Sequence, residues 1–221
     1  MTIQNDNMKD SEFYTFLDEA FRNANEMLKP GGAFYVWYAD SEDINFRNAL
    51  INNKLFIHQQ LIWVKQHFNF GRQDYKWQHE PCLYGWKEGD AHYFVEEYNN
   101  PTIIEDKLDF EKMKKEEMKS LLEEIYSDHV AKTIIGEKKP TINDLHPTMK
   151  PIRMCAKLIR NSTKRNEIVL DLFGGSGSTL IACEQLGRRC YTMEYDPHYV
   201  DVIIQRWEDY TGEKAELING T

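Results

Sequence analysis

The stretch from Ile168 to Gly187, IVLDLFGGSGSTLIACEQLG, limits most strongly what this chain can fold into. A short apolar run ends in an acid, Asp171, and three glycines follow closely, at Gly174, Gly175 and Gly177. Helix-forming residues come after them, so this order predicts a strand, a glycine-rich loop and a helix. Glycines let backbone N–H groups approach a ligand, and the start of the helix adds the positive end of its dipole. The loop is therefore a candidate binding site.

A second acid, Glu194, follows the next predicted strand. It lies about 20 residues beyond the glycines, where nucleoside-binding βαβ units carry the carboxylate that meets the ribose hydroxyls. The dinucleotide pattern G-x-G-x-x-G is not met, because Leu180 stands at the third glycine position counted from Gly175, and no P-loop lysine follows. The pattern favours a nucleoside cofactor. The alternative is a glycine turn that serves only to pack the helix on the strand.

Length and composition indicate one domain over residues 1–221, since 41% hydrophobic residues suffice for one sizeable core. The longest apolar run, Ala33 to Ala39, is much shorter than the roughly 18 residues of a membrane span, and the polar first residues do not resemble a signal peptide. We expect a cytoplasmic protein. The four cysteines include no C-x-x-C pair and the histidines are scattered, so we expect reduced core cysteines and no metal site.

A net charge of −9 argues against a protein that coats polyanions nonspecifically, so a nucleic-acid surface has to be a local patch. One candidate lies between residues 145 and 166, where six cations stand without an acid: Lys150, Arg153, Lys157, Arg160, Lys164 and Arg165. A solvated helix face explains them equally well. A second candidate mixes aromatic and basic residues, which suits stacking on bases and contact with phosphates: Lys65, Phe68, Phe70, Arg72, Tyr75, Lys76 and Trp77. The aromatic members could instead cover the core.

Hydrophobic periodicity predicts an α/β order of elements. The predicted helices cover residues 11–28, 41–50 and 146–163, with a last helix that Asp196 and Pro197 begin, and the predicted strands cover 33–40, 56–66, 79–87 and 213–219. The strand at 33–40 is apolar as far as Ala39, which predicts burial on both faces, as in a parallel sheet. Residues 89–144 are more polar and carry a strongly charged helix, so we expect an inserted lobe there.

Three segments in this order resemble the beta-type, permuted DNA amino-methyltransferases of bacteria and phages: HPTMKP at 146–151, DLFGGSGST at 171–179 and MEYDPHYVD at 193–201. The resemblance covers nearly the whole chain. It implies a Rossmann-like fold that binds S-adenosyl-L-methionine (AdoMet), with a mostly parallel sheet, helices on both faces and a helical insert. The target-recognition region would span residues 88–145.

Carried over by position, the resemblance implies roles for individual residues. The AdoMet site would be lined by Asp171, Phe173, Gly174, Gly175, Ser176 and Gly177, with Glu194 on the ribose and with His146, Thr148 and Lys150 beside the methionine end. DNA would be contacted by Lys65, Arg72, Tyr75, Lys76 and Trp77.

One feature of that family is missing from this sequence. The catalytic motif of the family is Asp, Asn or Ser followed by Pro-Pro and an aromatic, at the end of a strand shortly before the first helix, and all seven prolines here are isolated. The nearest string, DPHY at 196–199, reads as a helix start, since Asp is a natural cap and Pro a natural first helical residue. We therefore name no catalytic residue and expect the first strand, with its motif, to be missing.

The resemblance implies methyl transfer from AdoMet to N6 of adenine in double-stranded DNA, as in restriction–modification, with a homodimer as a further implication. Cytosine N4 is the alternative target. A truncated, non-catalytic protein that still binds AdoMet and DNA is a second alternative. A methyltransferase for small molecules or proteins is a third, which the aromatic–basic segment disfavours.

Overall fold

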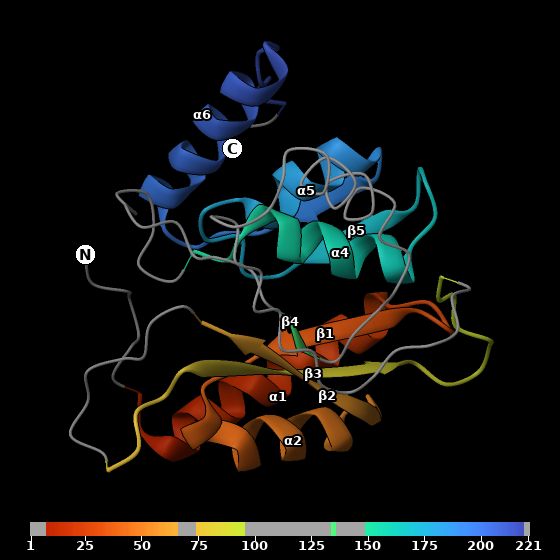
Figure 1. Ribbon diagram of the computed structural model, residues 1–221, viewed down its shortest axis with the longest axis vertical. Helices are drawn as coiled ribbons and strands as arrows, with labels where there is room; N and C mark the ends of the chain where they lie inside the picture. The colour runs from red at the N-terminus through yellow and green to blue at the C-terminus, as the bar shows by residue number, and fades with distance from the viewer. Residues whose placement is uncertain (1–7, 66–73, 96–133, 136–148, 219–221) are drawn as a thin grey trace, which may run out of the picture.

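A computed structural model describes residues 8–65, 74–95, 134–135 and 149–218 (Figure 1). Its strands form a four-stranded sheet in the order β1-β3-β2-β4 and a two-stranded sheet of β5 and β6. The strands are β1 (Ala33–Trp37), β2 (Ile57–Val64), β3 (His79–Trp86), β4 (Ile134–Ile135), β5 (Ile168–Asp171) and β6 (Arg189–Thr192). The strands expected within 33–40, 56–66 and 79–87 are thus confirmed, although the first ends at Trp37 and not at Asp40. No strand forms over 213–218, so the expected final strand is wrong for those residues.

The larger sheet is mixed and not mostly parallel. Strand β3 runs antiparallel to both β1 and β2, while β2 pairs parallel with β4 and β5 pairs parallel with β6. The continuous apolar run of β1 predicts burial on both faces, but its five residues are all only partly buried. Helices can cover both faces of such a strand whatever its direction is. The inference from apolarity to a parallel sheet was therefore wrong.

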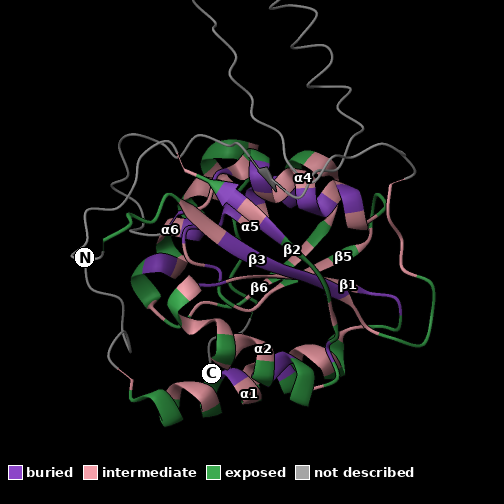
Figure 2. Ribbon diagram, turned by 60° about the horizontal axis from the view of Figure 1, so that its bottom comes forward, coloured by how far each residue is buried: buried purple, intermediate pink, exposed green. Residues whose placement is uncertain are grey.

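Helices cover both faces of the larger sheet, with α1 and α2 on one face and α4 on the other. The helical elements are α1 (Asp10–Met27), the short 3-10 turn η1 (Asp40–Glu42), α2 (Asp43–Asn52), α4 (Ile152–Ser162), α5 (Ser178–Leu186) and α6 (Pro197–Thr211). Leu83 of β3 joins the core of α1 and α2, whereas its neighbours Cys82 and Tyr84 point to the opposite face and pack with Met154 and Leu158 of α4. The alternation follows from the two-residue period of a strand. Figure 2 shows β3 buried along most of its length between these layers.

Helix α4 also joins the two sheets. Its residue Ile159 packs with Ala182 and Cys183 of α5 and with Val169 of β5. At one end of the strands, Lys29 Nζ lies 2.8 Å from Glu167 Oε1, and the hydroxyl groups of Tyr35 and Ser162 lie 2.6 Å apart. Lys29 comes shortly before β1 and Glu167 directly before β5, so the amino ends of these two strands are held near each other.

Local signals at helix ends are confirmed where the structure describes them. The Asp196 carboxylate accepts the His198 N–H at 2.9 Å, and Pro197 opens α6, so DPHY is a helix start. The helix expected at 146–163 begins at Ile152, after Pro151. Most of the expected insert lies outside the described residues, apart from its first part up to residue 95 and the two residues of β4. Within the described ranges, no helix is long and apolar enough to cross a membrane.

Candidate functional site

The two acids singled out in the sequence meet at the carboxyl ends of β5 and β6. Asp171 is the last residue of β5, and Glu194 follows β6 by two positions. The Gly175 N–H donates to Glu194 Oε2 at 2.7 Å, and the Gly174 N–H donates to the Met193 carbonyl at 2.8 Å. The glycine loop is therefore bound directly to the turn that carries Glu194, as the βαβ interpretation predicts.

The loop needs glycine for two different reasons. A Cβ on Gly174 would lie 2.6 Å from Thr192 Oγ1 and 3.0 Å from Ile203 Cδ1, so no side chain fits there. Gly175 and Gly177 have φ angles of +54° and +77°, in the left-handed region that other residues rarely adopt. Gly177 is also the N-cap of α5, so the loop directs the start of that helix toward the carboxyl ends of the strands.

Asp171 is held as a hydrogen-bond acceptor in this loop. Its Oδ1 accepts the Phe173 N–H at 3.1 Å, and the Thr179 hydroxyl donates to its carboxylate. Burial raises the pKa of Asp171, and the nearby Glu194 carboxylate raises it further, while the bonds from Thr179 and Phe173 and the charge of Lys150 act in the opposite direction. Bringing a cation to this carboxylate would relieve the cost of burying its charge.

Lys150 lies beside this loop in a set of three charged side chains. Its Nζ is 3.3 Å from Glu80 Oε2 on β3, and Lys65 Nζ, just after β2, is 2.6 Å from Glu80 Oε1. Although burial acts to raise the pKa of Glu80, the two ammonium groups lower it overall. The Lys150 carbonyl accepts the Ser178 hydroxyl at 2.8 Å, which fixes the backbone of Lys150 to the start of α5. We call these three residues the Glu80 triad.

The remaining predicted cofactor residues divide into described and undescribed ones. Ser176 is buried, and its carbonyl accepts a bond from Arg206 of α6. Phe173 is 57% exposed, and its ring lies 5.8 Å from that of Phe16 on α1. His146 and Thr148 lie outside the described residues, so their roles stay predictions.

The predicted DNA contacts do not form one uniform surface. Tyr75 is 91% exposed and Trp77 is 37% exposed, with its ring 5.5 Å from that of His79. Lys76 takes part in a further interaction within the fold. Lys65 is largely buried in its pair with Glu80, which competes with contact to a phosphate. Arg72 lies outside the described residues.

Sequence reasoning missed three residues at this site. Met193 and Tyr195 flank Glu194 and are 57% and 81% exposed, so they offer apolar surface next to the carboxylate that is predicted to bind ribose. Their position beside Glu194 in the sequence was a usable signal. Glu80 gave no such signal, because its partners Lys65 and Lys150 are 15 and 70 residues away along the chain and meet it only in the fold.

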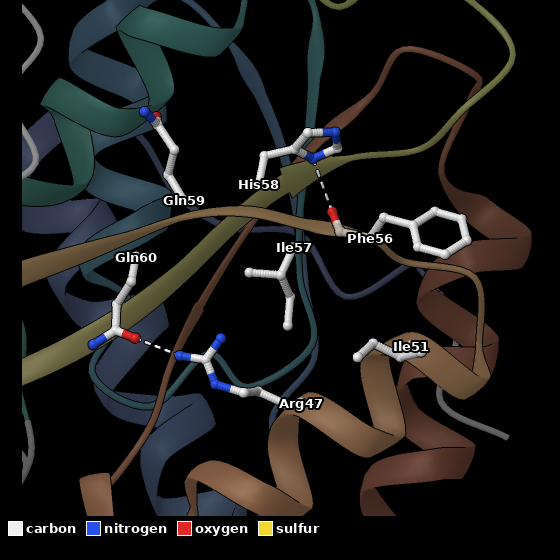
Figure 3. Close-up of a pocket in the computed structure, with 7 residues that line it drawn as sticks. All are labelled: Arg47, Ile51, Phe56, Ile57, His58, Gln59 and Gln60. Atoms are coloured by element: carbon white, nitrogen blue, oxygen red, sulfur yellow. Dashed lines mark hydrogen bonds between the residues drawn. The ribbon is translucent and has the colours of Figure 1, made fainter.

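A hollow of about 400 Å³ lies elsewhere, along the start of β2 and next to α2 (Figure 3). Its wall includes Arg47, which donates to the Gln60 side chain, and His58, whose Nδ1 lies 3.0 Å from the Phe56 carbonyl. None of the predicted site residues lines it. Within the described ranges, no three His, Cys, Asp or Glu side chains are grouped as metal ligands.

The groups at the strand ends fit the chemistry of AdoMet. Carboxylates can accept bonds from an ammonium group or from ribose hydroxyls, and each oxygen of Glu194 keeps a second lone pair beyond its bonds to the backbone of Gly175 and Asp196. Lys150 offers an ammonium for a carboxylate. At Gly174 the loop carries no side chain, and a Cβ there would contact Thr192 and Ile203.

Comparison with known proteins identifies the family. The family model described as DNA methylase matches residues 1–206. The type II methyltransferase M.BglII of Bacillus subtilis is 24% identical over 92% of this chain, which spans 59% of that relative's length. The M1.HpyAVI–SAM complex has 21% identity and a TM-score of 0.64 over 90% of this chain and 85% of that one. The cytosine-N4-specific PvuII DNA methyltransferase has 16% identity and a TM-score of 0.68 over 94% and 76%.

The cofactor of the matched family is AdoMet. Because the family match extends over nearly all described elements, from α1 to the first two-thirds of α6, the chain belongs to the DNA methylase family.

Proposed function

We propose that this chain is part of a DNA methyltransferase that transfers a methyl group from AdoMet to N6 of adenine in double-stranded DNA. The observation that carries the proposal is that the glycine loop after Asp171 is bound to Glu194 by the Gly175 N–H, at the ends of two adjacent parallel strands. This arrangement holds two acceptors beside a loop rich in glycine, which suits a nucleoside that carries an amino-acid group.

Each charged group at the site then has a task. Asp171 accepts bonds from the cofactor's ammonium group, Lys150 pairs with its carboxylate, and Glu194 accepts the ribose hydroxyls. Met193 and Tyr195 provide apolar surface for the adenine ring. His146 and Thr148 belong to the methionine end in this proposal. Bound AdoMet supplies an activated methyl group on sulfonium.

The DNA surface of the proposal includes residues from the segment between β2 and β3 and the region 88–145. Tyr75 and Trp77 are exposed aromatic side chains, and Lys76 and Arg72 stand close to them in the sequence. Aromatic side chains can stack on bases, while cations meet phosphates. Lys65 contributes less to phosphate binding than the sequence predicts, because Glu80 already pairs with it.

The pairing of the described strands supports a location for the missing catalytic motif. Among the described strands, β1 pairs only with β3 and β5 only with β6, and α4 packs across both groups. Two strands that flank a third are about 10 Å apart, a distance that the long side chains of Lys29 and Glu167 can bridge. We propose that a strand carrying the (Asp/Asn/Ser)-Pro-Pro-aromatic motif belongs between β1 and β5, and that this chain has no turnover without it.

That motif matters because an exocyclic base amine is a weak nucleophile. Its lone pair is conjugated into the ring, so the base has to be flipped out and its N–H groups held while the methyl group lies in line. No described residue is assigned to this task. Cytosine N4 remains the second candidate target, which the similarity to the PvuII enzyme favours. A role in restriction–modification and a homodimeric state stay predictions.

The test is calorimetric titration with AdoMet and S-adenosylhomocysteine, alongside transfer of labelled methyl groups to mixed-sequence DNA. We expect binding that Asp171→Ala abolishes, without transfer by this chain alone. Transfer by the chain alone would contradict the missing strand, and nucleoside analysis of the product would then distinguish N6-methyladenine from N4-methylcytosine. Absence of binding to either ligand would contradict the assignment of the pocket.

A further inference from the structure

The Glu80 triad connects the larger sheet to the cofactor loop. Glu80 lies on β3, near the end at which β5 finishes, and its two carboxylate oxygens contact two different ammonium groups, Lys65 at 2.6 Å and Lys150 at 3.3 Å. All three side chains are at least 70% covered, with exposed fractions of 27% for Glu80, 13% for Lys65 and 25% for Lys150. A partly buried ion pair of this kind is screened by solvent less than an exposed one.

The backbone of Lys150 is held in place, whereas its ammonium group would be free to move without Glu80. The bond from Ser178 holds its carbonyl at the start of α5, whereas its four-carbon side chain has many rotamers. The Lys150 charge also acts on the Asp171 carboxylate. Loss of Glu80 would let the ammonium turn toward Asp171, which the proposed function assigns to the ammonium group of the cofactor.

The triad also has an unbalanced charge. Two ammonium groups and one carboxylate leave a net charge of +1, so one more carboxylate would neutralise the set. Buried charges are stable when they are paired and hydrogen-bonded. An anionic group of a ligand next to Lys150 would complete that pairing.

We propose that Glu80 is a positioning residue, which holds the Lys150 ammonium toward the amino-acid end of AdoMet so that the cofactor carboxylate completes the triad. This inference rests on the proposed role of Lys150 in cofactor binding. Glu80 itself does not touch the cofactor. Its effect is confined to ligands that carry the carboxylate.

The test uses two ligands and calorimetric titration of the whole chain. Glu80→Gln is expected to weaken AdoMet binding about tenfold, the usual scale for loss of a charge-assisted bond. Binding of 5′-methylthioadenosine, which has the nucleoside and the sulfur but no amino-acid group, is expected to stay within twofold. Glu167→Gln is the matched control, because it removes the ion pair with Lys29 at the opposite strand ends and should leave both affinities unchanged.

Further variants distinguish an effect on the position of the Lys150 ammonium group from a general effect on folding. Lys65→Met removes the extra positive charge but leaves the Glu80–Lys150 pair, so AdoMet and not 5′-methylthioadenosine should bind more weakly. In a Lys150→Met background, Glu80→Gln should have no added effect on AdoMet binding. Unchanged or tighter AdoMet binding by Glu80→Gln, or equal weakening of both ligands, would overturn the inference. If the unmodified chain binds neither ligand, the proposed function fails instead.

Discussion

Replacing Gly177 by Ala tests whether AdoMet binding needs the loop conformation that glycine allows at this position. Gly177 has a φ of +77°, and a Cβ there would lie 3.2 and 3.3 Å from Cγ1 and Cγ2 of Ile203. Gly212, which ends α6, offers a matched control. Its φ is +74°, and a Cβ there would meet nothing within 4 Å. The two substitutions share the same backbone strain, and only the first adds crowding.

The difference in stability follows from these two contributions. An L-residue in the left-handed region costs about 1.5 kcal/mol of folding free energy. Crowding in a packed region costs about 1.5 kcal/mol more, at the low end for overpacking, since Ile203 needs to move only a few tenths of an ångström. Gly177→Ala should therefore lose about 3 kcal/mol in total and Gly212→Ala about 1.5 kcal/mol.

Thermal unfolding followed by circular dichroism measures this difference. At about 3 °C per kcal/mol for a chain of this size, Tm should fall by about 9 °C for Gly177→Ala and by about 4–5 °C for Gly212→Ala. AdoMet affinity, measured by calorimetry well below either Tm, should fall at least tenfold for Gly177→Ala and stay unchanged for Gly212→Ala, because only Gly177 belongs to the loop joined to Glu194.

Two results would refute this reasoning. An equal fall in Tm for both variants would mean that the contact with Ile203 has no energetic weight. An AdoMet affinity for Gly177→Ala within twofold of the unmodified chain would mean that the loop geometry between β5 and α5 is not what binds the cofactor.

Two further predictions concern single side chains. Asp171→Asn should raise stability at neutral pH, because burial raises the pKa of the Asp171 carboxyl group in the folded state. The stabilising contribution of this group is present below its unfolded pKa of about 3.9 and is lost as pH rises through its folded pKa. Urea unfolding between pH 4 and 8 should show the advantage growing with pH, while calorimetry shows weaker AdoMet binding; an advantage largest at acidic pH would contradict the sign. Tyr75→Ala should weaken binding to a fluorescent DNA duplex about fivefold or more, as expected for one lost base-stacking contact. Tyr210→Ala, which changes a tyrosine 50% exposed on α6, is its control and should bind as the unmodified chain does.

The sequence predicted well those features that depend on neighbouring residues. The order of apolar run, acid and glycines defined β5, the loop and α5, because glycine conformations and helix starts are local properties. The distance from the glycines to Glu194 predicted their meeting, since one helix and one strand return the chain to the same edge of a sheet. The Asp196 cap of α6 was predicted for the same local reason.

Features that depend on distant residues were not predictable in this way. The apolar run of β1 could not reveal its antiparallel partner β3, since helices can cover the two faces of a strand whichever way its neighbour runs. The charge of Lys65 suggested contact with a phosphate, yet Glu80 pairs with it in the fold. Charged residues in a sequence show what they could bind, whereas the fold determines which partner is near.

Helix α4 explains why the proposed cofactor site depends on the core of the larger sheet. Met154 and Leu158 fix the helix against Cys82 and Tyr84 of β3, and Ile159 fixes it against α5. Lys150, two residues before α4 begins, therefore comes to lie between Glu80 on β3 and the Ser178 hydroxyl that starts α5. Apolar contacts on two sides of α4 thus determine where Lys150 lies. The place of its ammonium group therefore depends on the packing of both sheets against this helix. A displacement of α4 would move that ammonium relative to Asp171 and Glu194 without changing any residue of the glycine loop.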